Sequence, residues 1–248
     1  MQAGNTAAAG VAVARPSSTV VLLRGDGAAP EVLMVRRHAA SAFGAAYAFP
    51  GGVVEADDRG VHAHCAGLSA EDADALLGTE HGLDYFSSAI RELFEETGVL
   101  LAQHDRVTSP LEPLRDRLND GSLAWHDFVA QNQIMLSCDA LDYFGYWVTP
   151  DVIPRRYSTR FFVAELPQGQ QAKHCGDELT DSVWMTASDV LAASEAGDML
   201  LHFPTLKTLA DIARHDSIAS VRDWCRVLQR QGIPRIQPTM VGGKPVIR

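Results

Sequence analysis

Three glutamates within five residues form a dense group of side chains that could do chemistry. Glu92, Glu95 and Glu96 are spaced by three, one and four positions, so on a helix their carboxylates would share one face. Such carboxylates repel one another and destabilise an isolated helix, and a bound cation offsets that repulsion. Because clustered hard oxygen ligands suit Mg²⁺ or Mn²⁺, the spacing favours a divalent metal site. The alternative is a solvated acidic helix face.

A helix that ends at Gly98 would position these glutamates. Gly98 stands where a helix needs a left-handed C-cap residue, and Asp84 is a candidate N-cap at the other end. The opposite face carries residues that would pack on a core, at positions Phe86, Ile90, Leu93, Phe94 and Thr97. The expected helix therefore has one buried face and one acidic face.

A second motif lies upstream, in Phe49-Pro50-Gly51-Gly52 and the acidic residues that follow it. Its two glycines let the backbone come close to a ligand or metal. With the segment 91–99, this motif resembles the signature of the Nudix hydrolases: a glycine, an acidic residue six positions on, then Arg-Glu-apolar-x-Glu-Glu-x-Gly-apolar. Gly52 matches the glycine, and the segment that begins at Arg91 matches the second part of the signature at every position. Asp58 stands where the family usually has Glu.

The two halves of the signature lie further apart here than in the family, which places seven residues between the acidic position and the arginine. Residues 60–86 fill an extra stretch, and a longer loop costs little stability. An insertion at this point, together with residues 147–162, resembles the coenzyme A diphosphatase subgroup of the mammalian peroxisomal type. The resemblance runs from about residue 20 to about residue 209.

The resemblance implies a Nudix fold, which is an α/β/α sandwich with a mixed β-sheet, here with inserted helices. It also implies hydrolysis of a diphosphate bond in a small nucleotide conjugate, with Mg²⁺ or Mn²⁺ as cofactor. From coenzyme A or acyl-coenzyme A the products would be 3′,5′-ADP and 4′-phosphopantetheine or its acyl form. The alternatives are a hydrolase of NADH, ADP-ribose or nucleotide sugars, and a non-catalytic domain that senses a nucleotide.

The same resemblance assigns roles to individual residues. Arg91 would orient the acidic residues of the signature, with Asp58 as its partner. The general base is either Glu92 or a carboxylate from a distant loop, for which Glu178 is the candidate and plain loop acidity the alternative. The expected metal ligands are the carboxylates of Glu92, Glu95 and Glu96 and the main-chain carbonyl of Gly52.

Four arginines are candidates for binding substrate phosphates, because a guanidinium offers a planar fork of donors. They are Arg37, Arg155, Arg156 and Arg160. The alternative for each is an ordinary solvated surface charge. Aromatic residues at 143–147 could stack on an adenine, although core packing is the expected role.

Composition excludes several other classes of function. The chain of 248 residues carries a net charge of -10 and no basic run, which argues against binding duplex nucleic acid. No apolar stretch approaches the roughly 18 residues of a membrane span. Four scattered cysteines show neither zinc spacing nor a disulfide framework, so we expect thiols in a reducing compartment, the cytoplasm. A homodimer is left open, because many relatives dimerise.

The expected organisation is one Nudix hydrolase domain over residues 15–215, after a disordered tail at 1–14. Insertions are expected at about 59–83 and 103–140, and residues 216–248 should form a C-terminal helix and an extended tail packed on the same domain. Strands are expected at 18–24, 31–37, 47–49, 143–149, 161–166 and 181–185. Further helices are expected at 70–77, 114–118, 123–133, 205–215 and 218–230, with another capped at 186–189 and running through 193.

Overall fold

A mixed sheet runs through the middle of the computed structural model, which describes residues 11–25, 29–37, 45–103, 111–175 and 179–247. Its central strands follow the order β10-β7-β8-β1-β2-β3, with β4 beside β1 and β9 beside β2. The β1–β8 and β7–β10 pairs are parallel, and the remaining pairs are antiparallel. The strands are β1 (Arg15–Arg24), β2 (Glu31–Arg37), β3 (Tyr47–Ala48), β4 (Gly51–Val53), β7 (Asp142–Val148), β8 (Tyr157–Glu165), β9 (Leu179–Thr186) and β10 (Arg235–Ile236).

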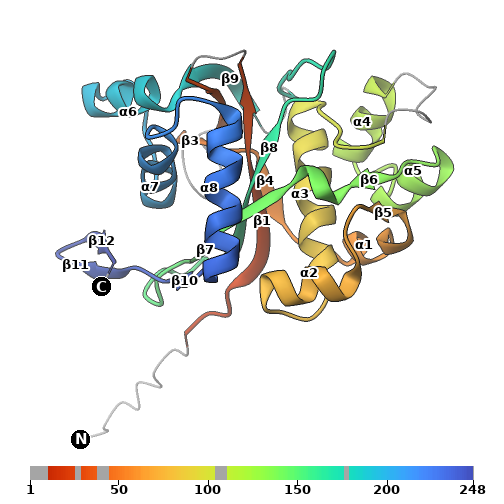
Figure 1. The fold of residues 1–248 in the computed structure, drawn as a ribbon, viewed down its shortest axis with the longest axis horizontal. Helices are drawn as coiled ribbons and strands as arrows, with labels where there is room; N and C mark the ends of the chain where they lie inside the picture. The colour runs from red at the N-terminus through yellow and green to blue at the C-terminus, as the bar shows by residue number, and fades with distance from the viewer. Residues whose placement is uncertain (1–10, 26–28, 38–44, 104–110, 176–178, 248) are drawn as a thin grey trace, which may run out of the picture.

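Helices cover both sides of this sheet (Figure 1). One side carries α1 (Ala56–Arg59), α2 (Ala70–Leu77), α3 (Gly82–Thr97), α4 (Glu112–Asn119) and α5 (Trp125–Gln131). The other side carries α6 (Ala187–Ala196), α7 (Phe203–Ile212) and α8 (Ile218–Gln231). Because strand side chains alternate between faces, Phe162 packs in the core under α3 and Phe161 in the core under α7 and α8. The expected α/β/α sandwich with a mixed sheet is confirmed.

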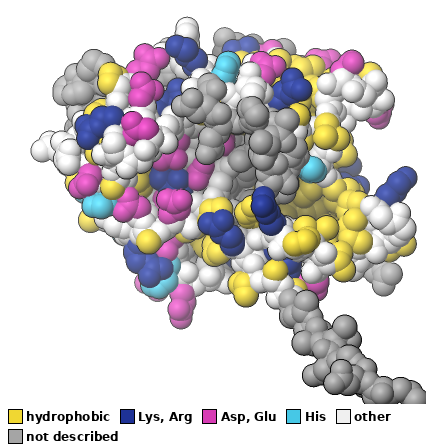
Figure 2. Space-filling view, turned by 180° about the vertical axis from the view of Figure 1, so that it is seen from behind, with side chains coloured by type: hydrophobic (Ala, Val, Ile, Leu, Met, Phe, Trp, Pro, Cys, Tyr) yellow, Lys and Arg dark blue, Asp and Glu magenta, His cyan; other side chains and the backbone are white. Residues whose placement is uncertain are grey.

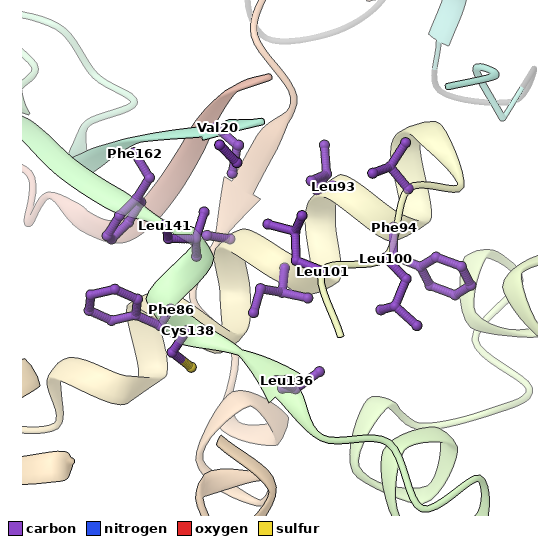
Figure 3. Packing of buried hydrophobic residues seen from close by; sticks show 14 of the residues in the cluster. Val20, Phe86, Leu93, Phe94, Leu100, Leu101, Leu136, Cys138, Leu141 and Phe162 are labelled. Atoms are coloured by element: carbon purple, nitrogen blue, oxygen red, sulfur yellow. The ribbon is translucent and has the colours of Figure 1, made fainter. Parts of the chain in front are cut away.

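Helix α3 is buried along the predicted apolar face. Phe86, Ile90, Leu93 and Phe94 are each at most 1% exposed, and Phe86 packs on Phe162 with ring centroids 4.9 Å apart. Figure 3 shows this packing, in which the apolar residues of α3 meet those of the strands and of the chain that follows the helix. The predicted C-cap is also confirmed, because Gly98 has φ 74° and its N–H donates to the Phe94 carbonyl.

The predicted start of this helix is wrong. Helix α3 begins at Gly82, with His81 at the N-cap position. The Gly82 N–H donates to Asp74 Oδ1 of α2 at 2.5 Å, so a tertiary contact places the N-cap three residues before the expected Asp84. Asp84 lies in the first turn, where its carboxylate pairs with Arg59 and His62.

The two insertions meet beside α3. Strand β5 (Cys65–Ala66) of the first pairs in parallel with β6 (Leu136–Ser137) of the second. Short 3₁₀ turns, η1 (His62–His64) and η3 (Cys138–Ala140), flank this pair. From α5, Trp125 Nε1 donates to Ser87 Oγ of α3 at 3.0 Å. Both insertions therefore brace the helix that carries the three glutamates.

The chain after residue 215 forms α8 and three short strands. Helix α8 packs on β7, where Gln229 Nε2 donates to the Tyr143 carbonyl and Arg222 pairs with Asp142. The end of the chain forms the hairpin of β11 (Thr239–Val241) and β12 (Lys244–Val246).

Strand β8 begins at residue 157, earlier than expected, because β1 and β7 pair with it from there. No helix in the described ranges is long and apolar enough to cross a membrane.

Candidate active site

The glycine turn at the start of β4 lies directly against the acidic face of α3. The Gly51 N–H donates to Glu96 Oε2 at 2.9 Å. At Gly51 the backbone has φ 153°, which disfavours any residue with a side chain. A Cβ added to Gly52 would lie 2.4 Å from Glu92 Oε1 and would displace that carboxylate. The two halves of the signature, separated by the first insertion, are therefore in contact.

Arg91 connects the acidic residues of the site from a buried position. Its side chain is 5% exposed, and Nε and Nη2 donate to the two carboxylate oxygens of Asp58, each at 3.1 Å. Nη1 donates to Glu92 Oε1 at 2.8 Å and to Glu95 Oε2 at 3.1 Å, and Nη2 also donates to the Val53 carbonyl. Burial alone would lower the pKa of Arg91, but Glu92 and Asp58 outweigh it and raise the pKa. Arg91 is charged and directs three carboxylates.

Asp58 is fully buried and completes this network. Its carboxylate accepts hydrogen bonds from the Glu55 N–H at 2.8 Å and from Ser87 Oγ at 3.0 Å, in addition to those from Arg91. Burial raises the pKa of Asp58, while Arg91 and the two other donors partly offset that effect. The shorter Asp side chain still reaches Arg91, since α1 brings it within range. The expected contact between Arg91 and Asp58 is therefore present, although the family usually has Glu at this position.

Among the carboxyl groups of the site with a resolved pKa shift, Glu95 has the largest shift. Burial raises its pKa, Glu92 and Glu55 raise it further by repulsion, and Arg91 only partly compensates, giving a pKa of about 7. Glu55 belongs to this group although the sequence reasoning did not single it out. Its position three residues after Gly52, among the acidic residues that follow the Phe49–Gly52 motif, was the available signal.

The donor chemistry fits a hard divalent cation. Among the described residues, no group of three or more His, Cys, Asp and Glu side chains is arranged to hold a metal ion. Carboxylate oxygens of Glu92 and Glu95 face Arg91, and one of Glu96 faces the Gly51 N–H. Burial, and then repulsion from Glu92 and Glu55, raise the pKa of Glu95, and a divalent cation bound by these oxygens would offset both effects.

The structure places the four predicted phosphate-binding arginines differently from one another. Arg155 is exposed. Arg156 is buried and braces the chain before β8, because it donates to the Ala12 and Thr149 carbonyls and pairs with Asp151. Arg37 lies in β2, but its side chain is outside the described residues, as is Glu178.

Arg160 is 3% exposed and lies under the C-terminal end of α2. Its Nη2 donates to the Leu77 carbonyl at 2.9 Å, and its guanidinium carbon lies 3.2 Å from the centroid of the Tyr146 ring. These contacts hold the end of α2 on the sheet. A phosphate role for any of the four arginines stays a prediction.

Charged side chains of both signs are interleaved on the side of the molecule that carries α1 to α5, whereas hydrophobic side chains gather on the opposite side of this view (Figure 2). In the parts that the structure describes, this face shows no continuous basic surface of the kind that holds duplex nucleic acid.

Comparisons with known proteins agree with this geometry. The model of the NUDT19 Nudix domain matches residues 69–212. The chain is 26% identical over 194 residues to nudix hydrolase 7 of Caenorhabditis elegans, and the match covers 78% of this chain and 57% of that protein's length. A Nudix hydrolase from Alicyclobacillus acidocaldarius has the same fold, with a TM-score of 0.72 and 23% identity over 85% of this chain and 96% of its own. Because the family model covers more than half of the 248 residues, the chain belongs to the Nudix hydrolase family.

Proposed function

We propose that this protein hydrolyses a diphosphate bond in a nucleotide conjugate, with Mg²⁺ or Mn²⁺ as cofactor and coenzyme A or acyl-coenzyme A as the first candidate substrate. The observation that carries the proposal is the contact between the Gly51–Gly52 turn and the glutamates of α3. This contact brings carboxylate oxygens and the main chain of the glycine turn close together. A cation that also binds a diphosphate requires oxygen ligands of this kind.

The proposed cation ligands are Glu92, Glu95, Glu96 and the main-chain carbonyl of Gly52. A bound divalent ion supplies charge neutralisation for the diphosphate oxygens and lowers the pKa of water. The chain supplies the positioning. Arg91 fixes the carboxylates of Glu92 and Glu95, and the Gly51 N–H fixes that of Glu96. Asp58 keeps Arg91 in place from the buried side.

Hydrolysis also needs a base to accept the proton of the attacking water. Glu92 is one candidate, because Arg91 holds its carboxylate beside Gly52. Glu178 is the other, carried from the family resemblance. The variants Glu92→Gln and Glu178→Gln separate them, because loss of the base removes the acidic limb of the pH profile of kcat.

Coenzyme A derivatives come first because the matching family model is that of the NUDT19 Nudix domain and because the first insertion lies within the signature. NADH, ADP-ribose and nucleotide sugars share the diphosphate and remain alternatives. Binding of the substrate phosphates by Arg37, Arg155, Arg156 or Arg160 stays part of the proposal, and among the three whose side chains are described only Arg155 is exposed.

The test is a panel assay of the purified protein with coenzyme A, acyl-coenzyme A, NADH, ADP-ribose and nucleotide sugars, each with Mg²⁺ or Mn²⁺ and with products resolved by mass. Release of 3′,5′-ADP supports the first candidate. Glu96→Gln should keep the fold and lose most metal-dependent turnover, whereas Glu71→Gln, on the exposed face of α2, should match the wild type. Tight binding of a substrate without any product would indicate a nucleotide sensor and not an enzyme. Turnover by Glu96→Gln equal to that of the wild type would overturn the assignment of Glu96 as a metal ligand.

A further inference from the structure

Helix α4 of the second insertion reaches the C-terminal end of α3. Arg115 is 5% exposed, and its Nε donates to the main-chain carbonyl of Glu95 at 3.0 Å. Asn119, one turn further along α4, donates from Nδ2 to the same carbonyl at 3.3 Å. The last carbonyls of a helix have no partner within it. Two side chains of the insertion therefore hold the main chain at one of the proposed metal ligands.

The guanidinium of Arg115 also places positive charge at the negative end of α3. Its Nη1 would lie 3.3 Å from a Cβ added to the C-cap residue Gly98, so it packs against the cap itself. Glu96 is among the acidic groups that favour its charged form. A cation at this end of a helix is stabilising, and here it also lies near a carboxylate of the site.

Burial makes this arrangement costly. Arg115 is 5% exposed, and its guanidinium has lost most of its hydration. Nη2 is buried without a hydrogen-bond partner among the described residues. An arginine that served α4 alone could keep its charge in solvent, as the exposed Arg117 does two positions later. The cost points to a role at α3.

We propose that Arg115 is a positioning residue for the glutamates of α3, holding the main chain at Glu95 and a positive charge at the C-terminal end of the helix. The second insertion is then part of the active site. This inference rests on the proposed function, because positioning is measured through the cation that the glutamates bind. Arg91 donates hydrogen bonds to the carboxylates of Glu92 and Glu95. Arg115 instead fixes the backbone from which these side chains project.

The test measures Mn²⁺ binding to the metal-free full-length protein by electron paramagnetic resonance, alongside kcat and KM in the Mn²⁺-dependent reaction. Arg115→Gln should bind Mn²⁺ about tenfold more weakly, the size expected when a group that orients metal ligands is lost. Its kcat should fall while KM for the substrate stays within about twofold. Arg115→Lys should recover part of both losses, and Asn119→Ala should show a smaller effect of the same kind. Arg117→Gln is the matched control and should equal the wild type.

The outcomes separate this inference from the proposed function. Wild-type protein that neither binds Mn²⁺ nor turns over substrate overturns both. If the wild type binds Mn²⁺ and Arg115→Gln has the same Mn²⁺ affinity and the same kcat, only the positioning role is overturned. Tighter Mn²⁺ binding at unchanged kcat also overturns it, because removal of a repelling charge would then be the only effect. If Arg115→Gln does not fold, Arg115→Lys and Asn119→Ala decide by the same criteria.

Discussion

Glu95 carries a stability cost in the metal-free protein that Glu95→Gln should remove. Its carboxyl has a pKa of about 7 in the fold, against 4.5 for an ordinary glutamate. At 1.36 kcal/mol per pH unit, this difference corresponds to about 3 kcal/mol. The side chain is only 20% exposed, so solvent screening reduces this figure little.

The sign of the effect follows from which state loses its proton first. Below pH 4.5 the Glu95 carboxyl is protonated in both states, and the fold suffers no penalty. Between pH 4.5 and about 7 the unfolded chain releases the proton while the fold retains it, so the free energy of unfolding falls as pH rises. Above pH 7 the loss is complete. The amide introduced by Glu95→Gln does not titrate, and it can still accept the hydrogen bond from Arg91.

The assay is urea unfolding at pH values from 4 to 8, with a chelator present, for the wild type, Glu95→Gln and the exposed control Glu71→Gln. At pH 4 the wild type and Glu95→Gln should be equally stable. At pH 8 Glu95→Gln should be more stable by about 2–3 kcal/mol, and it should have lost most metal-dependent turnover. The control should follow the wild type throughout. Parallel curves for the wild type and Glu95→Gln would refute the reasoning, since burial and repulsion would then not disfavour the charged form of Glu95 in the fold.

Two further substitutions test the network around the glutamates. Gly52→Ala places a Cβ 2.4 Å from Glu92 Oε1, so we expect turnover to fall about 100-fold through displacement of Glu92. Wild-type kcat in this variant would contradict the close approach. Asp58→Asn puts an amide NH2 where both carboxylate oxygens accept hydrogen bonds from Arg91, Ser87 and the Glu55 N–H, and should cost about 1–3 kcal/mol in urea unfolding. Asp57→Asn, in the same short helix but half-buried, is its control, and equal losses in the two would show that Asp58 has no special role.

The sequence alone was sufficient where the determining interactions are local. The spacing of Phe86, Ile90, Leu93 and Phe94 defined the buried face of α3, because helical periodicity alone decides which side chains share a face. The left-handed C-cap at Gly98 followed from the conformational freedom of glycine. The fold and the family followed from the motif around Gly52 and from residues 91–99, whose contact the resemblance predicted.

Tertiary structure decided what depends on contacts between residues distant in the chain. Helix α3 starts at Gly82 because Asp74 accepts its N–H, and no helix propensity encodes that contact. Burial of Arg156 and Arg160 depends on which strands flank β8, so residue type alone could not separate them from exposed Arg155. The raised pKa of Glu95 and the approach of Arg115 likewise depend on distance and desolvation. Sequence supplied the charges of this site, and folding fixed their separations and their exclusion from water, which set the strength of every interaction among them.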